Sequence, residues 1–128
     1  MIFVAMILKT LVLGASMKPQ RHSYRTILAL LDNGFPVVAV GPRQGEVAGI
    51  QVLEGFPVLR GIHTISLYLK PEAQHEYVDY ILSLRPRRII FNKKTYNPVL
   101  AEKAIAHGIR VTEDCTLVML AKGMYEGD

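Results

Sequence analysis

The sequence predicts a three-layer α/β domain with a five-stranded, mostly parallel sheet between two layers of helices. Short apolar, β-branched runs end abruptly and alternate with stretches in which apolar residues recur at helical spacing. Such runs are typical of strands buried on both faces of a parallel sheet, and their alternation with helices indicates right-handed crossovers. The length of 128 residues suits one domain, residues 1–128, which can fold without disulfides or a structural metal.

Five strands are expected in chain order, at residues 10–13, 37–40, 65–69, 88–91 and 109–112. We expect their order in the sheet to be 3-2-1-4-5. Residues 41–64 lie outside this alternation and are so dense in glycine that they predict turns and at most one short helical turn.

Four helices follow from spacing and capping residues. Ser23 is suited to cap the first, and the second is expected at residues 71–84, opened by its own proline. Asn97 is suited to cap the third, which Gly108 ends, and Asp114 to cap the fourth.

Composition excludes several classes of protein. A single cysteine rules out a disulfide framework and any Cys-based zinc or iron–sulfur site, and it favours a reducing cytoplasm. The four histidines lack metal-ligand spacing. The apolar amino-terminal run has no basic region before it, so a strand is favoured over a signal peptide, and no run is long enough to span a membrane. A net charge of +4 favours an anionic ligand.

Ligands of such sheets bind at the carboxyl ends of the strands, near the point where strand order reverses. There the first strand is followed by Gly14, Ala15 and Ser16, a basic loop and a helix amino terminus, all of which suit a phosphate. The chain contains neither a G-x-G-x-x-G fingerprint nor a P-loop, which argues against ordinary nicotinamide dehydrogenases and NTPases.

These segments resemble a known family. L-V-L-G-A-S at 11–16, K-P-Q-R-H-S-Y-R at 18–25 and V-V-A-V-G-P-R at 37–43 are similar to the small stand-alone CoA-binding proteins, which are related to the CoA-binding domain of the succinyl-CoA synthetase α subunit. The resemblance extends over about residues 9–118 and implies a Rossmann-like domain that binds coenzyme A. The chain departs from the family pattern at Gly41-Pro42, where Asn-Pro is usual, and at Asn92-Lys93-Lys94, where a Gln and a Gly-containing turn are usual.

The resemblance also implies where CoA lies. The diphosphate is expected on the loop after the first strand and on the following helix, and the 3′-phosphate among basic side chains at the ends of the second and third strands. The candidate CoA-binding residues are Gly14, Ala15, Ser16, Arg21, Ser23, Tyr24, Arg25, Val40, Gly41, Pro42, Arg43, Leu69 and Lys70.

We therefore expect a cytoplasmic module that binds CoA or an acyl-CoA and has no catalysis of its own, because no nucleophile with its base can be named. One alternative is a small enzyme acting on a nucleotide or thioester through Cys115 or the Glu113-Asp114 pair. Another is a protein that binds NAD(P) or a different nucleotide, although no acidic residue follows the second strand to hold a ribose. Nucleic-acid binding is a distant alternative, because the basic cluster in residues 85–110 accompanies no recognition motif. The sequence leaves open which acyl group is bound and whether the chain forms homo-oligomers.

Overall fold

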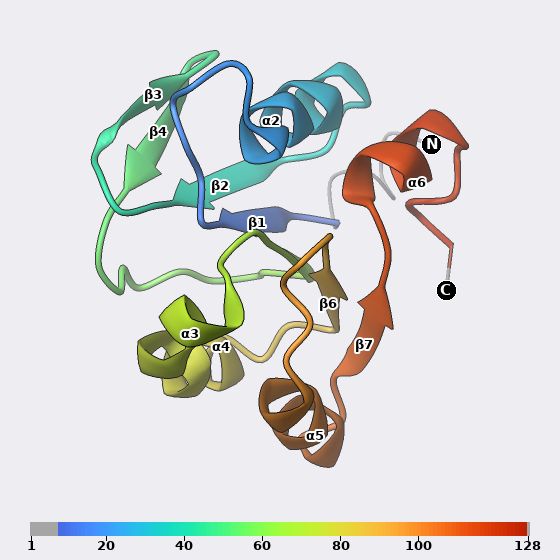
Figure 1. Ribbon diagram of the computed structural model, residues 1–128. Coiled ribbons are helices and arrows are strands. Elements are labelled where there is room, and N and C mark those ends of the chain that lie inside the picture. The colour runs from blue at the N-terminus through green and yellow to red at the C-terminus, as the bar shows by residue number, and fades with distance from the viewer. Residues whose placement is uncertain (1–7, 128) are drawn as a thin grey trace.

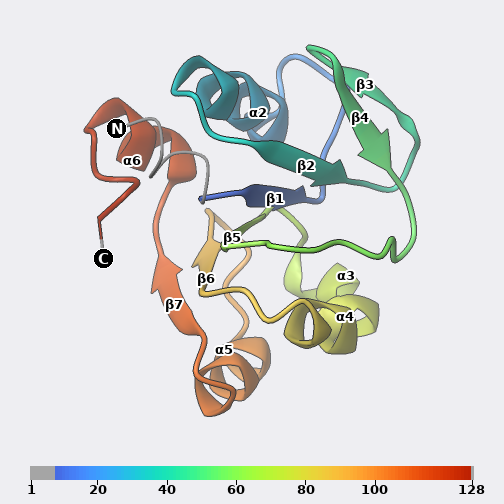
Figure 2. The same ribbon diagram turned by 180° about the vertical axis from the view of Figure 1, so that it is seen from behind.

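The computed structural model describes residues 8–127 and shows a three-layer α/β domain (Figure 1). Within these residues, one seven-stranded sheet has the order β3-β4-β2-β1-β5-β6-β7, and all neighbouring pairs except β3–β4 are parallel. Helices α2 and α6 cover one face and α3, α4 and α5 the other, as Figures 1 and 2 show. The elements are β1 Thr10–Leu13, α2 His22–Asp32, β2 Val37–Val40, β3 Gly45–Val47, β4 Ile50–Leu53, β5 Thr64–Leu67, α3 Pro71–Gln74, the 3₁₀ turn η1 His75–Tyr77, α4 Val78–Ser83, β6 Arg88–Phe91, α5 Pro98–Ala106, β7 Arg110–Glu113 and α6 Thr116–Ala121.

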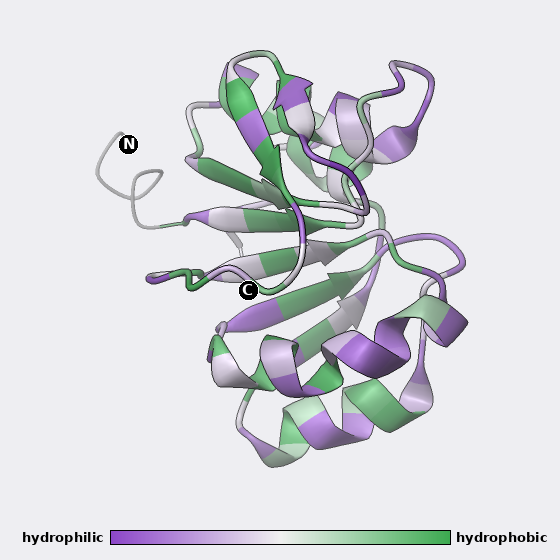
Figure 3. Cartoon of the chain, turned by 90° about the vertical axis from the view of Figure 1, so that its left-hand side faces the viewer, coloured by the Kyte–Doolittle hydropathy of each residue, from purple (hydrophilic) through white to green (hydrophobic). Residues whose placement is uncertain are grey.

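The central strands form the middle of the core. Every residue of β1, β5 and β6 is buried, because helices cover both faces of the sheet there. One core cluster, with Leu100 and Ile81, lies under α4 and α5, and a second, with Ile27 and Leu120, lies under α2 and α6. Figure 3 shows the apolar strands between the more polar helical layers. The α/β class and the mostly parallel sheet are thus confirmed.

The predicted count of five strands and the order 3-2-1-4-5 are wrong. Residues 45–53 form a hairpin, β3–β4, whose turn at Ala48-Gly49 has positive φ at both residues (50° and 85°). Such a turn joins short antiparallel strands, so two of the glycines that suggested irregular loops, Gly45 and Gly49, belong to a regular hairpin. β4 pairs with β2, in the place given to the strand near residue 65, and that strand, β5, pairs with β1 instead. Counted among the parallel strands alone, the order is 3-2-1-4-5-6, with β4 as the third strand.

Two helix caps also differ from expectation. The N-cap of α2 is Arg21, two residues before the expected Ser23, and the Ser23 hydroxyl does not cap the helix. Cys115 is the N-cap of α6, and a carboxylate oxygen of Asp114 accepts from the Cys115 N–H (2.7 Å). The Asn97 cap of α5 is confirmed, with its side-chain oxygen accepting from the first amides of the helix.

In residues 8–127 no helix has the length and apolar character needed to cross a membrane. The same residues contain no group of three or more His, Cys, Asp and Glu side chains arranged to hold a metal ion. Most of the apolar amino-terminal run, residues 1–7, lies outside the described part of the chain.

Candidate functional site

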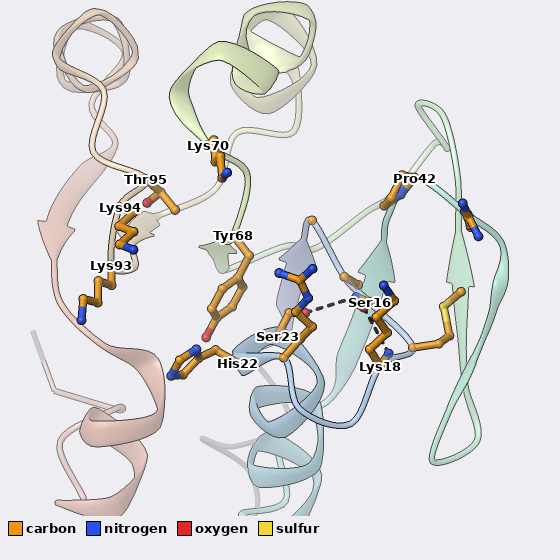
Figure 4. Close-up of a pocket in the computed structure, with 15 residues that line it drawn as sticks. Ser16, Lys18, His22, Ser23, Pro42, Tyr68, Lys70, Lys93, Lys94 and Thr95 are labelled. Atoms are coloured by element: carbon orange, nitrogen blue, oxygen red, sulfur yellow. Dashed lines mark hydrogen bonds between the residues drawn. The ribbon is translucent and has the colours of Figure 1, made fainter.

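A cleft of about 890 Å³ opens at the carboxyl ends of the central strands (Figure 4). Its position follows from the strand order. β2 pairs with β1 on one side and β5 pairs with β1 on the other, so the order of the strands reverses at β1, where such sheets bind ligands. Its volume lies in the range of small-molecule sites, about 300–1,000 Å³. We call it the basic lobe; it is lined by Gly14, Ala15, Ser16, Met17, Lys18, Arg21, His22, Ser23, Pro42, Arg43, Tyr68, Lys70, Lys93, Lys94 and Thr95.

Gly14 is required where β1 ends beside β5. Its φ of +95° is a conformation that side chains rarely adopt, and a Cβ there would lie 2.9 Å from the carbonyl carbon of Tyr68. Its N–H and that of Ala15 both donate to the carbonyl oxygen of Val40 (2.8 and 3.0 Å). The glycine thus serves the packing of three strand ends as well as the floor of the cleft.

Gly41 fits the end of β2 against the same loop. A Cβ at this position would lie only 2.2 Å from the carbonyl oxygen of Ala15, closer than real Cβ contacts ever come. The N–H of Gly41 donates to the carbonyl oxygen of Leu53, at the end of β4 (2.8 Å). The packing in this structure leaves no room for a side chain at Gly41.

The loop after β1 is held to the start of α2 by its serines. The N–H of Ser16 donates to the Ser23 hydroxyl (3.1 Å), and the N–H of Lys18 donates to the Ser16 hydroxyl (3.1 Å). Figure 4 shows both bonds at one wall of the cleft. No side chain caps α2, and its first turn has no acidic residue. The amino terminus of α2 therefore presents amides and the positive end of its dipole to the cleft.

The opposite wall is fixed by Gln74, which is fully buried. Its amide nitrogen donates to the carbonyl oxygens of Leu69 (2.8 Å) and Thr95 (2.7 Å), and its oxygen accepts from the Asn97 side chain (3.1 Å). One side chain thus joins the loop after β5 to the loop after β6. These are the loops that carry the lysines of this wall.

A second buried amide, Asn92, orders the end of β6. Its nitrogen donates to the Ser66 hydroxyl (3.0 Å) and to the carbonyl oxygen of Leu67 (3.1 Å), and its oxygen accepts from the N–H of Thr116 (2.9 Å). The backbone carbonyl oxygen of Asn92 accepts a further hydrogen bond from the Thr95 hydroxyl (2.8 Å). Asn92 is therefore structural, and the residues after it form the cleft wall.

Tyr68 lies between the two walls in Figure 4. Its hydroxyl is hydrogen-bonded to the hydroxyl of Thr26 on α2. Burial raises the pKa of Tyr68 above its ordinary value, which outweighs the hydrogen bonds that lower it. The side chain is thus a neutral, anchored partition in the cleft.

The charge of the basic lobe has one sign. Three of its cations, Lys18, Arg21 and Arg43, come from the loops after β1 and β2, and the other three come from the opposite wall. None of its lining residues is Asp or Glu. All six side chains are exposed, and cations gathered around a concave site attract a ligand with several negative charges.

A second hollow of about 550 Å³ shares Gly14 and Pro42 with the basic lobe and has a different chemistry. We call it the aromatic lobe; it is lined by Gly14, Val40, Gly41, Pro42, Glu54, Gly55, Phe56, Leu69, Ala73, Glu76 and Tyr77. The rings of Phe56 and Tyr77 lie 5.0 Å apart between centroids. Its two carboxylates repel phosphate, so the lobe suits an uncharged or cationic part of a ligand.

Most residues expected from the sequence come together at these hollows. The basic lobe is lined by Ala15, Ser16, Arg21, Ser23, Arg43 and Lys70, the aromatic lobe by Val40, Gly41 and Leu69, and both lobes by Gly14 and Pro42. Tyr24 and Arg25 line neither: Tyr24 packs against the core beneath α2, and Arg25 is exposed.

Sequence reasoning missed part of the cleft. Lys18 and His22 belong to the loop that was singled out, and Lys93 and Lys94 follow β6, yet none was chosen as a binding residue. The rule for strand ends points to Lys93 and Lys94 as well, because they follow β6, and their place in the lining agrees with it. Cys115, Glu113 and Asp114 line neither lobe.

Three comparisons with known proteins bear on this site. A solved structure described only as an uncharacterized protein shares 41% identity over 94% of this chain and 98% of its own, with a TM-score of 0.90. A hypothetical protein from Pyrococcus horikoshii OT3 has 25% identity, covering 96% of this chain and 87% of its own, with a TM-score of 0.80.

A dinucleotide-forming acetyl-coenzyme A synthetase from Ca. Korarchaeum cryptofilum, solved with phosphate and ADP, shares the fold at 18% identity. The match covers 84% of this chain and 26% of that one, with a TM-score of 0.68. No curated protein matches the chain. The family model described as CoA binding domain matches residues 9–121, and the chain therefore belongs to the CoA binding domain family.

Proposed function

We propose that the protein binds coenzyme A, free or acylated, at the cleft and carries out no reaction on it. The observation that supports this most is the basic lobe, with six Lys and Arg side chains and no acidic residue in its lining. CoA carries a diphosphate and a 3′-phosphate, and the latter alone brings about −1.5 to −2 charges at neutral pH. Such a ligand matches the charge of the lobe.

The diphosphate is assigned to the wall formed by residues 14–16 and α2. Backbone amides and a helix amino terminus without a side-chain cap are suited to phosphate oxygens. The Ser23 hydroxyl already accepts from the N–H of Ser16, so its own proton can be donated to the ligand. Ser23 does not cap α2, so its hydroxyl is available for this role.

The 3′-phosphate is assigned to Arg43 and Lys70, which reach the basic lobe from the loops after β2 and β5. An arginine binds a phosphate with a planar fork, and a lysine binds it as a point charge. These positions also favour CoA over NAD, because Gly41-Pro42-Arg43 stands where a ribose-binding carboxylate would follow β2.

The hydroxyls of the cleft favour binding without catalysis. In the described residues, the hydrogen bonds that fix Ser16 and Ser23 come from backbone amides, and Tyr68 is bonded to a threonine. A nucleophilic serine instead needs a basic side chain as its partner. The candidate thiol and carboxylates at 113–115 line neither lobe.

Calorimetric titration of the purified protein with CoA, dephospho-CoA, NAD and ATP tests the proposal. We expect CoA to bind more tightly than NAD and ATP, and dephospho-CoA to bind more weakly than CoA because it lacks the 3′-phosphate. Binding of NAD as tight as that of CoA would overturn the assignment of the ligand. Turnover of an acyl-CoA thioester by the purified protein would overturn the absence of catalysis.

A further inference from the structure

β7 forms one edge of the sheet and has an open outer side. In residues 8–127 its only partner strand is β6. The N–H groups of Arg110 and Asp114 donate to carbonyl oxygens on the β6 side. Residues of a strand alternate in direction, so the N–H and C=O groups of Val111 and Glu113 point away from β6. β7 therefore presents a backbone template for one more strand.

The two edges of the sheet differ in how they are protected. β3 is a three-residue strand that begins at a glycine and ends in a tight turn, so it offers less backbone for pairing than β7, which has four residues. β7 has neither proline nor lysine to block pairing. Its charged side chains are of both signs, with exposed Arg110 before Val111 and exposed Glu113 and Asp114 after Thr112. Charges of both signs do not repel a second copy.

We infer that β7 pairs antiparallel with β7 of a second copy, around a two-fold axis at Thr112. A two-fold axis normal to the sheet keeps each face on its own side, so only residues an even number of positions apart can face each other. Centring at Thr112 places Arg110 opposite Asp114 of the copy, twice, and Thr112 opposite itself. Val111 of each chain then faces Glu113 of the other. These two residues exchange backbone hydrogen bonds, because their N–H and C=O groups point away from β6.

The charges select this register. Arg110, Thr112 and Asp114 occupy non-hydrogen-bonded positions, where facing Cα atoms lie about 4.5 Å apart and side chains interact most. Opposite charges and Thr–Thr pairs both stabilise such positions. If the axis passed through Val111 instead, Arg110 would face Thr112 of the copy, and no Arg110–Asp114 pair would form.

Flanking helices add apolar surface to the pairing. α5 and α6 lie on opposite faces beside β7 (Figures 1 and 2), and the same axis brings each helix toward its own copy. Ile105 on α5 is 59% exposed and Val118 on α6 is 42% exposed. The paired edge is short, so we expect an interface smaller than the standard of about 800 Å² per partner and therefore a weak, reversible dimer.

Sedimentation equilibrium over about 1–500 µM protein tests the inference on the full chain. We expect a reversible dimer whose dissociation constant rises about tenfold or more in Arg110→Asp, because two attractive pairs become repulsive. Asp114→Arg tests the same pair from its other side, and the double variant R110D/D114R should restore the wild-type constant. Arg60→Asp, an exposed charge reversal away from β7, is the matched control.

Each outcome decides the matter. A chain that stays monomeric at the highest concentration contradicts the inference, and so does a dimer that neither single reversal weakens. Weakening by both single variants without recovery in the double variant also contradicts it, because recovery is specific to a facing pair. Recovery supports it even where one single variant is less stable.

Discussion

Gln74 and Thr95, far apart in the chain, are joined by a hydrogen bond of 2.7 Å from the Gln74 amide to the Thr95 carbonyl oxygen. The same amide donates to the Leu69 carbonyl oxygen (2.8 Å). The loop that carries Lys70 and the loop that carries Lys93 and Lys94 are thus held at a fixed separation. The spacing of cations on this wall depends on one buried, uncharged side chain.

Gln74→Ala should destabilise the fold and weaken CoA binding. The change leaves two buried carbonyl oxygens without their partner, at a cost of about 1–3 kcal/mol each at most, and it frees the two loops. Urea unfolding and calorimetric titration check both effects. Gln51→Ala, an exposed change on β4, is the control, and equal stability of the two variants would show that Gln74 does not hold the wall.

Gly41→Ala should lower stability more than its size suggests. The added Cβ would lie 2.2 Å from the Ala15 carbonyl oxygen, so either the end of β2 or the loop after β1 must shift. We expect a loss of about 1–3 kcal/mol, as for overpacked positions, measured by urea unfolding. Gly127→Ala, whose Cβ would meet its nearest neighbour at an ordinary 3.5 Å, should change stability little. A Gly41 variant as stable as wild type would contradict this packing.

Gly14, like Gly41, is packed too closely against backbone for a substitution there to test ligand binding alone. A valine at residue 14 would be strained at φ +95° and would press on the backbone of Tyr68. Loss of binding in Gly14→Val would therefore reflect damage to the fold as well as to a phosphate site. Side chains that reach into the cleft are the better probes.

Local signals in the sequence were sufficient for much of the fold. Buried strands such as β1 and β6 appear as continuous apolar runs, and Asn97 before a proline marks the start of α5. The β3–β4 hairpin was missed because its strands are short and half-exposed, and its glycines look like those of an irregular loop. The error in strand order followed from that one omission.

The candidate site was predictable to the extent that it lies directly after strands. Gly14 and Lys70 follow their strands immediately or nearly so, and the rule for strand ends selects them. Ser23 lines the cleft, and its bond to Ser16 depends on how the loop folds back, which the sequence does not reveal. The aromatic lobe depends on Phe56 and Tyr77 meeting across the chain, which periodicity does not reveal.

Stability should fall in alkaline solution in part through Tyr68. Burial raises its pKa above the ordinary 10.0, so the folded state holds the phenolic proton more tightly than the unfolded state does. The folded state then binds more protons above pH 10, and the free energy of unfolding decreases as pH rises through the folded pKa. Below the unfolded pKa this contribution is fully present.

Urea unfolding of wild type and Tyr68→Phe from about pH 8 to pH 11 isolates this effect, because other alkaline titrations are common to both proteins. Phenylalanine loses the bond to Thr26, so the variant should be less stable at pH 8, and the difference should shrink as pH rises. A difference that stays constant with pH would contradict a raised pKa for Tyr68.

The two walls of the basic lobe should contribute separately to CoA affinity. Arg43→Ala removes a cation from the wall near β2, and the double variant Lys93→Ala, Lys94→Ala removes two from the opposite wall. A charged hydrogen bond to phosphate is worth about 1.5–3 kcal/mol when formed, less at exposed side chains because solvent screens them. We expect about tenfold weaker binding for Arg43→Ala and partial recovery in Arg43→Lys, which keeps the charge but loses the fork.

Titrations at low and high salt should show a smaller salt dependence in each variant, because fewer ion contacts remain to be screened. Lys103→Ala, on the exposed side of α5, is the control and should match wild type at every salt concentration. If the lysine-pair variant also matches wild type, those two side chains are solvated rather than bound to CoA, and the phosphates are held by the wall of α2, Arg43 and Lys70.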